Sequence, residues 1–157
     1  NEIMDYATSR ARSAGVELAV RHIGEAVPSA DPYQLKQALL NLVLNAVEAA
    51  ETNNIGEKFV SIMSDTTNEN EWRLEVRDNG HGIRPEHQLR IFDPFFTTKE
   101  KGTGLGLAIV KEVAELHSAV IEIKGRAEGP GTCFIVRFPE ERKRGDSSTT
   151  GTTVRIS

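Results

Sequence analysis

The residues best suited to do chemistry lie in one stretch, from Phe92 to Leu107. It joins an aromatic cluster, a loop with Lys99, three alternating glycines and the start of an apolar-periodic run that is typical of a helix; the glycines are Gly102, Gly104 and Gly106. Glycines before a helix let the backbone curl around an anion, and the first helical turn offers unpaired N–H groups and a partial positive charge. The stretch therefore predicts a phosphate site with a flexible loop in front of it.

A second group of polar residues follows one line of a predicted helix. The line is spaced at i, i+4, i+8 and i+11, so its members share one helix face: Gln37, Asn41, Asn45 and Glu48. Asparagine is a poor helix former, which favours a specific role for the two in mid-helix. An amide oxygen suits Mg2+, which takes few protein ligands and accepts phosphate oxygens for the rest. A solvent-facing helix edge explains the same spacing.

Asp78 closes an amphipathic strand and precedes the turn Asn79-Gly80-His81-Gly82. A carboxylate there could accept a hydrogen bond from the exocyclic amine of adenine, whereas guanine offers a keto oxygen at that position. An ordinary Asp-Asn-Gly turn is the alternative interpretation. Lys99 could balance phosphate charge or be an exposed loop lysine.

Helices and strands in a mixed order must position these residues. Helices are predicted over residues 1–14, 31–51 and 105–116, and the second has Asp31 as its cap and Pro32 in its first turn. Strands are predicted over residues 16–23, 59–64, 72–77, 120–124 and 132–138. Hairpin-like pairing of 59–64 with 72–77, and of 120–124 with 132–138, predicts an α+β fold. This fold is a two-layer sandwich with a mixed, mostly antiparallel sheet and helices on one face.

Two local patterns refine this picture. In the strand over 72–77, Trp72, Leu74 and Val76 alternate with charged residues, which predicts one buried face and one wet face. Residues 83–103 form a long connection with one short helix near 86–91, and so long a connection in a compact domain is often a lid. Three phenylalanines in it could pin the lid to the domain: Phe92, Phe95 and Phe96.

Size and charge exclude several classes of protein. A chain of 157 residues fits one domain, which we assign to residues 1–139, and a Ser/Thr/Gly-rich flexible tail or linker is expected over 140–157. The net charge of -4 without a basic stripe argues against a nucleic-acid partner. The single Cys133 suits a reducing compartment, and no apolar run approaches membrane-spanning length, so no membrane contact by this domain is expected.

Four segments, in order, resemble the four boxes of the catalytic, ATP-binding domain of sensor histidine kinases, in the superfamily shared with gyrase, chaperone and mismatch-repair ATPases. They are Asn41-Leu-Val-Leu-Asn45-Ala, Asp78-Asn-Gly-His-Gly82, Phe92-Asp-Pro-Phe-Phe-Thr-Thr-Lys99 and Gly102-Thr-Gly-Leu-Gly106-Leu. The segment Gly129-x-Gly131-Thr132-x-Phe134 is similar to the family's ending. The resemblance covers nearly all of residues 1–139, and two of its segments, Asp93-Pro-Phe-Phe-Thr-Thr-Lys99 and Asn45-Ala-Val-Glu-Ala49, resemble the nitrogen-regulation subtype in particular.

The resemblance implies a role for each matching residue. Asn45 would ligate Mg2+ and Asn41 would lie beside the phosphates of ATP. Asp78 would bind adenine, with Gly80 and Gly82 letting the backbone close around the base. Lys99, in a lid over residues 84–103, would approach the terminal phosphates and, with Asn41, serve catalysis. The remaining implied nucleotide-binding positions are Ile83, Phe92, Thr98, Gly102, Thr103, Gly104, Leu105, Gly106 and Leu107.

The resemblance also implies partners. The domain would bind ATP and ADP and transfer the γ-phosphoryl group to a histidine on a separate dimerisation domain, since none of the four histidines here stands in the family's phosphoacceptor context. A response regulator receiver domain would be served indirectly. The expected location is the cytoplasm, with a parent protein that can be membrane-anchored. One local departure is His117-Ser118-Ala119, where the family usually has His-Gly-Gly.

The superfamily that these segments resemble also includes proteins with other functions. Hydrolytic relatives activate water with a glutamate where this chain has Asn41, and an amide cannot take a proton at neutral pH, which argues against hydrolysis. A serine kinase of the superfamily, or a scaffold that binds nucleotide without transfer, are the alternatives.

Overall fold

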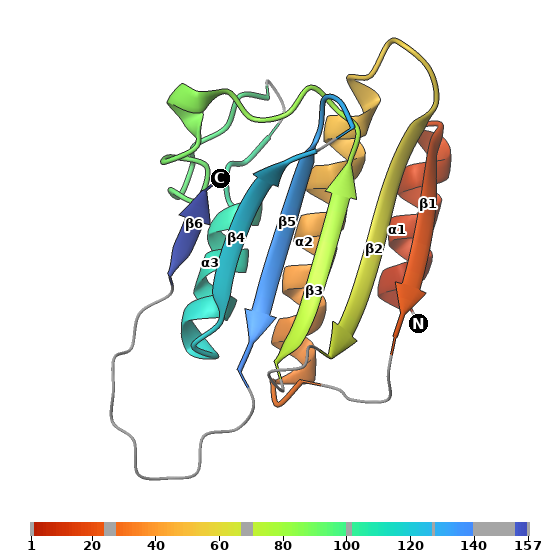
Figure 1. Ribbon diagram of the computed structural model, residues 1–157. Helices are drawn as coiled ribbons and strands as arrows, with labels where there is room; N and C mark the ends of the chain where they lie inside the picture. Colours follow the sequence, from red (N-terminus) through yellow and green to blue (C-terminus); the bar gives the residue numbers. More distant parts are fainter. Residues whose placement is uncertain are drawn as a thin grey trace, which may run out of the picture.

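One mixed sheet and three α-helices make up the fold of the part of the chain that the computed structural model describes, residues 2–23, 28–66, 71–99, 102–126, 128–139 and 153–156. The helices are α1 (Glu2–Ser13), α2 (Pro32–Glu51) and α3 (Gly106–Leu116). The strands are β1 (Val16–His22), β2 (Lys58–Thr66), β3 (Trp72–Asp78), β4 (Val120–Gly125), β5 (Thr132–Phe138) and β6 (Val154–Ile156). All three helices cover one face of the sheet (Figure 1), which confirms the predicted α+β sandwich.

The sheet order is β1-β2-β3-β5-β4-β6. The two predicted hairpins form as expected: β2 pairs with β3 and β4 pairs with β5, both antiparallel, and β3 joins β5 at the centre. The edge strands β1 and β6 are parallel to their neighbours. This order places the end of β3, with Asp78, directly opposite the start of β5, with Thr132.

The central helix α2 begins where the sequence predicts. The Asp31 carboxylate accepts hydrogen bonds from the N–H groups of Tyr33 (2.9 Å) and Gln34 (3.1 Å), and Pro32 occupies the first turn, where its missing N–H costs nothing. One side of α2 is buried against the sheet, through Ala38, Leu42, Val43, Ala46, Val47 and Ala50. The polar line of α2 therefore points away from the sheet, toward α3 and the lid.

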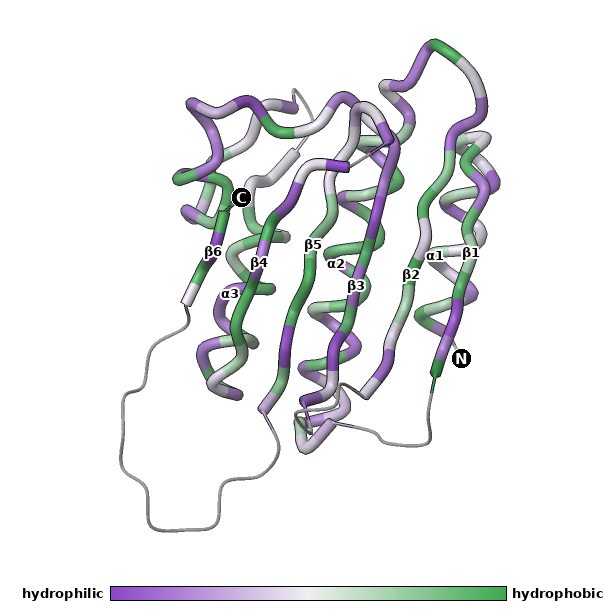
Figure 2. The backbone as a smooth tube through the Cα atoms, viewed as in Figure 1, coloured by the Kyte–Doolittle hydropathy of each residue, from purple (hydrophilic) through white to green (hydrophobic). Residues whose placement is uncertain are grey.

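The predicted wet face of β3 is wrong at Glu75, which is only 3% exposed. Figure 2 shows hydrophilic and hydrophobic residues mixed along the central strands. Glu75 lies in a central strand between Met63 of β2 and Ile135 of β5, and Arg77 forms an ion pair with it. Long neighbouring side chains cover a short carboxylate in the middle of a sheet, so alternation alone does not predict exposure there.

The predicted flexible tail differs from the structure at its end. Val154–Ile156 pair with Ile121–Ile123 of β4, and the Ile121 N–H donates to the Thr153 carbonyl at 3.0 Å. Val154 and Ile156 pack against the core while Arg155 is exposed, so a three-residue apolar alternation is enough to extend the β4 edge. Residues 140–152 lie outside the described part of the chain.

The connection between β3 and α3 and the end of α3 also follow local rules. The predicted short helix near 86–91 is a single 3-10 turn, Pro85–His87. At the departure from the family's glycines, Ser118 adopts a positive φ of 53°, a backbone region that favours glycine. The Ala119 N–H still donates to the Ala114 carbonyl at 2.8 Å, so the turn closes without glycine.

Candidate functional site

Two clusters of predicted site residues form at the same end of the sheet. The first, the helix–lid cluster, consists of Asn41, Asn45 and Glu48 on α2 with Lys99 in the connection that leads to α3. Lys99 Nζ donates to Asn45 Oδ1 at 3.4 Å and forms an ion pair with Glu48 Oε2. The structure thus joins residues that lie 54 and 51 positions apart in sequence. It also adds Glu48, which the sequence analysis placed on the polar line but not in the site.

Asn41 faces the start of α3. Its Nδ2 donates to the Gln37 carbonyl at 2.9 Å, which leaves its Oδ1 as a free acceptor of the amide group. A Cβ atom at Gly106 would lie 3.1 Å from that Oδ1, so a larger residue there would crowd the Asn41 amide. The free N–H groups of a helix start and an amide oxygen therefore meet at one point.

The second group, the strand-end cluster, consists of Asp78, Gly80, Gly131 and Thr132. Asp78 is 1% exposed, and its Oδ1 accepts the Gly80 N–H at 2.9 Å. Burial raises the Asp78 pKa to about 6, against hydrogen bonds from the backbone of Gly80 and Thr132 and the positive charges of Arg126 and Lys99, which all lower it. A carboxylate so placed ionises at neutral pH while remaining shielded from water.

The glycines of the strand-end cluster are needed for close backbone approach. A Cβ at Gly80 would lie 2.2 Å from the carbonyl oxygen of Ala49 on α2, and a Cβ at Gly131 would lie 2.2 Å from the carbonyl oxygen of Asp78. Gly82 has a positive φ of 81°. The turn after β3 is therefore packed directly onto the backbone of both α2 and the β4–β5 turn.

The connection between β3 and α3 is held at two points, Phe92 and Phe95. Phe92 is 6% exposed and packs edge-on against Phe134, with ring centroids 6.4 Å apart. The Phe95 N–H donates to the Gly104 carbonyl at 2.9 Å, and a Cβ at Gly104 would lie 2.4 Å from the carbonyl carbon of Phe95. The Phe95 side chain itself is 75% exposed. Phe92 thus anchors the lid, and its predicted contact with nucleotide stays a prediction.

The remaining predicted residues lie along the lid and the start of α3. Gly102 is close to Thr97, whose Oγ1 would be 2.6 Å from a Cβ there. Thr103 Oγ1 accepts the Leu105 N–H at 3.4 Å, and Leu107 packs against the core. Thr98 is exposed. None of these contacts excludes or requires a ligand, so the roles implied for Thr98, Gly102, Thr103, Leu105 and Leu107 stay predictions.

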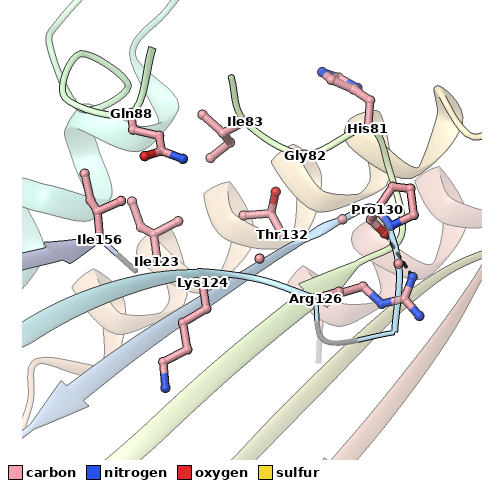
Figure 3. A pocket seen from close by; sticks show the side chains of 13 residues that line it. His81, Gly82, Ile83, Gln88, Ile123, Lys124, Arg126, Pro130, Thr132 and Ile156 are labelled. Carbon is pink, nitrogen blue, oxygen red and sulfur yellow. Dashed lines mark hydrogen bonds between the residues drawn. The ribbon is translucent and has the colours of Figure 1, made fainter. Parts of the chain in front are cut away.

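A cavity adjoins the strand-end cluster (Figure 3). Its lining includes Gly82, Ile83, Gln88, Ile123, Thr132 and Ile156, and Arg126 reaches toward Pro130. Asp78, Asn45 and Lys99 are not among its lining residues, so the cavity extends the strand-end cluster sideways, toward β4 and β6. Two of the predicted positions, Gly82 and Ile83, line it. The sequence signal for Thr132 was its place directly after the second glycine of Gly129-x-Gly131.

A metal held by protein side chains alone does not fit this site. Among the described residues no group of three or more His, Cys, Asp or Glu side chains is placed to hold a metal ion. Asn45 Oδ1 does accept a hydrogen bond from the cationic Lys99 Nζ, so its oxygen faces a positive charge. With Lys99 Nζ displaced, that one amide oxygen suits a hard cation that draws most of its ligands from elsewhere, as Mg2+ does beside phosphates.

Fold and site together define an α+β domain whose long β3–α3 connection lies beside α2. Residues 30–142 match the family model described as "Histidine kinase-, DNA gyrase B-, and HSP90-like ATPase". The chain belongs to this family. Within the described residues, no helix combines the length and apolarity that crossing a membrane requires.

Relatives narrow the class to sensor kinases. The chain is 40% identical to sensor protein kinase PilS of Pseudomonas aeruginosa over 72% of its own length and 21% of the relative. It is 41% identical to sensor histidine kinase ZraS of Salmonella typhimurium, over 70% of this chain and 23% of the relative. The catalytic domain of histidine kinase ThkA superposes with a TM-score of 0.74 and 32% identity, over 88% and 90% of the two chains.

The chain is therefore the ATP-binding catalytic domain of a sensor histidine kinase. It spans about a fifth of the length of the curated relatives it matches. The nitrogen-regulation subtype stays a prediction.

Proposed function

We propose that this domain binds Mg-ATP and transfers its γ-phosphoryl group to a histidine on a separate dimerisation domain of the parent kinase. The observation that carries the proposal is the meeting of Lys99, on the lid, with Asn45 and Glu48 on α2. A lysine ammonium can bind the negative phosphate oxygens of a triphosphate, and a neighbouring amide oxygen can bind its Mg2+ ion. The start of α3 beside Asn41 supports the same assignment.

The residues of the chain divide the work. Asp78 would accept a hydrogen bond from the adenine amine, and the close packing at Gly80 and Gly131 would hold that carboxylate in place. Asn45 would hold Mg2+, which supplies neutralisation of phosphate charge. Lys99 would approach the terminal phosphates as it leaves Glu48. Positioning and charge neutralisation then provide most of the catalysis.

Transfer needs no general base on this domain. The bond between the γ-phosphorus and the oxygen bridging to the β-phosphate breaks, a bond to an imidazole nitrogen forms, and ADP leaves with the electron pair. A neutral imidazole is already a nucleophile, and it releases its proton to solvent. Asn41 stands where a hydrolytic relative would use glutamate, and an amide cannot activate water. The proposal places the domain in the cytoplasm, with a receiver domain as the next acceptor.

The Asp78→Ala variant tests the nucleotide assignment. We expect ATP to bind about 1.5–3 kcal/mol more weakly, the range for a hydrogen bond to a charged group. Calorimetric titration of both proteins at pH 8 would measure this, and equal affinities would sink the adenine assignment. The transfer step is tested with γ-labelled ATP and a separately added dimerisation domain: label on its histidine is expected, whereas steady ATP hydrolysis by this domain alone would argue for an ATPase.

A further inference from the structure

Arg126, which follows β4, holds the β4–β5 turn against the rest of the sheet. Its Nη1 donates to the Pro130 carbonyl at 3.0 Å (Figure 3), and its guanidinium lies over the ring of Phe59 on β2, with Cζ 4.9 Å from the centroid. The side chain is only 18% exposed, although it sits in a surface turn. Arg126 therefore bridges β2, β4 and the turn that leads into β5.

The anchors of Arg126 leave its charge largely unneutralised. A carbonyl oxygen and an aromatic face attract a cation, but neither carries a full negative charge. The carboxylate partner that the structure gives it, Glu128, is 4.0 Å away and 89% exposed, where an ion pair contributes little. The positive charge is therefore available to a group on the inner side of the turn.

That group is Asp78. The same glycine, Gly131, separates the two residues: a Cβ there would lie 2.2 Å from the Asp78 carbonyl oxygen and 2.6 Å from Arg126 Cδ. The backbone of Asp78 and the stem of Arg126 thus lie within contact distance of a single position. Asp78 also pairs with Thr132, the first residue after this turn. Any shift of the turn moves Thr132 relative to the buried carboxylate.

We propose that Arg126 is a positioning residue for Asp78: it fixes the turn that carries Thr132, and its charge keeps the Asp78 carboxylate ionised at neutral pH. The inference rests on the proposed function, because an ionised Asp78 matters only if that carboxylate accepts a hydrogen bond from adenine. The β4–β5 turn would then take part in recognition of the base. The side chain responsible, Arg126, lies outside the segments that resemble the family in the sequence.

The charged groups around Asp78 come from two directions. Arg126 approaches from the β4–β5 turn and Lys99 from the lid, and both lower the Asp78 pKa against burial, which raises it to about 6. The register partners of Asp78, Val60 on β2 and Thr132 on β5, are uncharged. Lys99 is already paired with Glu48. Arg126 is therefore the nearby cation whose charge is least committed elsewhere.

Nucleotide affinity measured across pH tests the inference. Calorimetric titration of ADP at pH 5.5 to 9 is expected to show wild-type affinity falling below about pH 6, as Asp78 takes up a proton. In Arg126→Met the midpoint of this fall should lie higher, by up to about one pH unit, because the Arg126 charge is one of the groups that lower the Asp78 pKa. Affinity should recover at pH 9. A turn that was merely disordered would bind weakly at every pH.

Three further variants make the outcome decisive. Arg126→Lys keeps the charge and should keep the wild-type midpoint. Arg126→Gln loses the charge but keeps a donor for the Pro130 carbonyl, so its midpoint should shift. This variant decides the outcome if Arg126→Met folds poorly. Lys124→Met is the matched control: this cation, two residues before Arg126, pairs with Glu122 at 3.1 Å, and its loss should leave the midpoint unchanged.

Two results would overturn the inference, and they differ from failure of the proposed function. An unchanged midpoint in both Arg126→Met and Arg126→Gln would mean that Arg126 does not act on Asp78. Asp78→Asn serves as the reference, since any pH dependence that it keeps comes from groups other than Asp78, such as the terminal phosphate of ADP. If Asp78→Asn binds ADP as tightly as the wild type, the adenine assignment itself is wrong.

Discussion

The strand-end cluster and the helix–lid cluster are built in opposite ways. In the first, a buried carboxylate and three backbone segments meet at distances that only glycine permits. In the second, the contacts join half-exposed side chains: Lys99 and Glu48 are 40% and 41% exposed. Backbone packed at van der Waals distance cannot yield, whereas long side chains change rotamer at little cost. One half of the site is therefore preformed, and the other is free to rearrange around its ligand.

The largest effect that tests this contrast should come from Gly80→Ala. The added Cβ would lie 2.2 Å from the Ala49 carbonyl oxygen and 2.5 Å from its carbonyl carbon, so β3 or α2 must move. We expect a loss of about 3 kcal/mol in the free energy of unfolding, the upper part of the range for overpacking. Urea unfolding followed by circular dichroism measures it.

Gly125→Ala is the matched control for Gly80→Ala. Gly125 ends β4 and has open space around its Cβ position, so its substitution should change stability by about 0.5 kcal/mol or less. Similar losses in the two variants would mean that the strand-end cluster tolerates movement, and the contrast between the clusters would disappear.

A smaller effect of opposite sign is expected from Asp78→Asn. The Asp78 pKa is raised to about 6 by burial, so the folded state binds a proton more tightly than the unfolded state does. Its contribution to stability is complete below about pH 4 and is lost as pH rises through 6. The neutral amide avoids this loss and should stabilise the domain by about 2–3 kcal/mol at pH 8, from a shift of about two pH units.

Unfolding of wild type and Asp78→Asn at pH 4 and pH 8 would measure that difference. The gain should be present at pH 8 and largely absent at pH 4, while nucleotide affinity falls at pH 8. A gain of equal size at both pH values would trace it to packing and not to charge. The domain would thus be less stable at pH 8 because it buries the ionised Asp78 carboxylate. Such a loss of stability is common where a protein holds a binding group in place before the ligand arrives.

The sequence predicts the preformed half well in outline and poorly in its contacts. Asp31 with Pro32 marks the start of α2, because helix capping depends only on neighbouring residues. The alternation within residues 72–77 marks β3, because successive side chains of a strand point to opposite faces of the sheet. The approach of Gly80 to Ala49 is not local, since it depends on how α2 lies across the sheet. A glycine that permits tight packing and a glycine that permits a turn look alike in sequence.

The same limit explains what was missed elsewhere. Glu75 is buried because it lies between β2 and β5, and no pattern within β3 reports which strands flank it. Glu48 was visible on the polar line of α2, but its pairing with Lys99 depends on where the lid lies. Val154–Ile156 form a strand because β4 offers an edge, a fact about the sheet and not about the tail. Contacts between distant segments are thus the part that sequence patterns omit.

The adjustable half is tested by Glu48→Gln. This carboxylate pairs with Lys99 and would also repel phosphate, so removing its charge should release the lysine and tighten ATP binding by about 0.5 kcal/mol, as for exposed ion pairs. The control is Glu51→Gln, which breaks the Arg10 ion pair one turn further along α2 and should leave affinity unchanged. Weaker binding in Glu48→Gln that depends on Mg2+ concentration would instead make Glu48 part of the metal site.

The smallest effect on nucleotide affinity should come from β6, at the outer wall of the preformed half. Ile156 lines the cavity beside Ile83 and Ile123, but it is half-buried and belongs to a three-residue strand. Ile156→Ser should therefore cost about 1 kcal/mol of stability, part of the value of a fully buried side chain. Arg155→Ser, on the exposed side of the same strand, should cost less. ADP affinity should stay within about twofold in both variants, because Asp78 is held by Gly80 and Thr132 and not by β6.

Hydrogen exchange gives this last prediction a local readout. The Ile121 N–H donates to Thr153 across the β4–β6 edge, so its exchange should accelerate in Ile156→Ser while the amide of Gly80, bonded to Asp78, stays protected. If loosening β6 also exposes the Gly80 amide and weakens ADP binding, then the strand-end cluster depends on the edge of the sheet. Its rigidity would then come from the whole β4–β6 layer, and the boundary between the preformed and adjustable halves would have to be drawn further from Asp78.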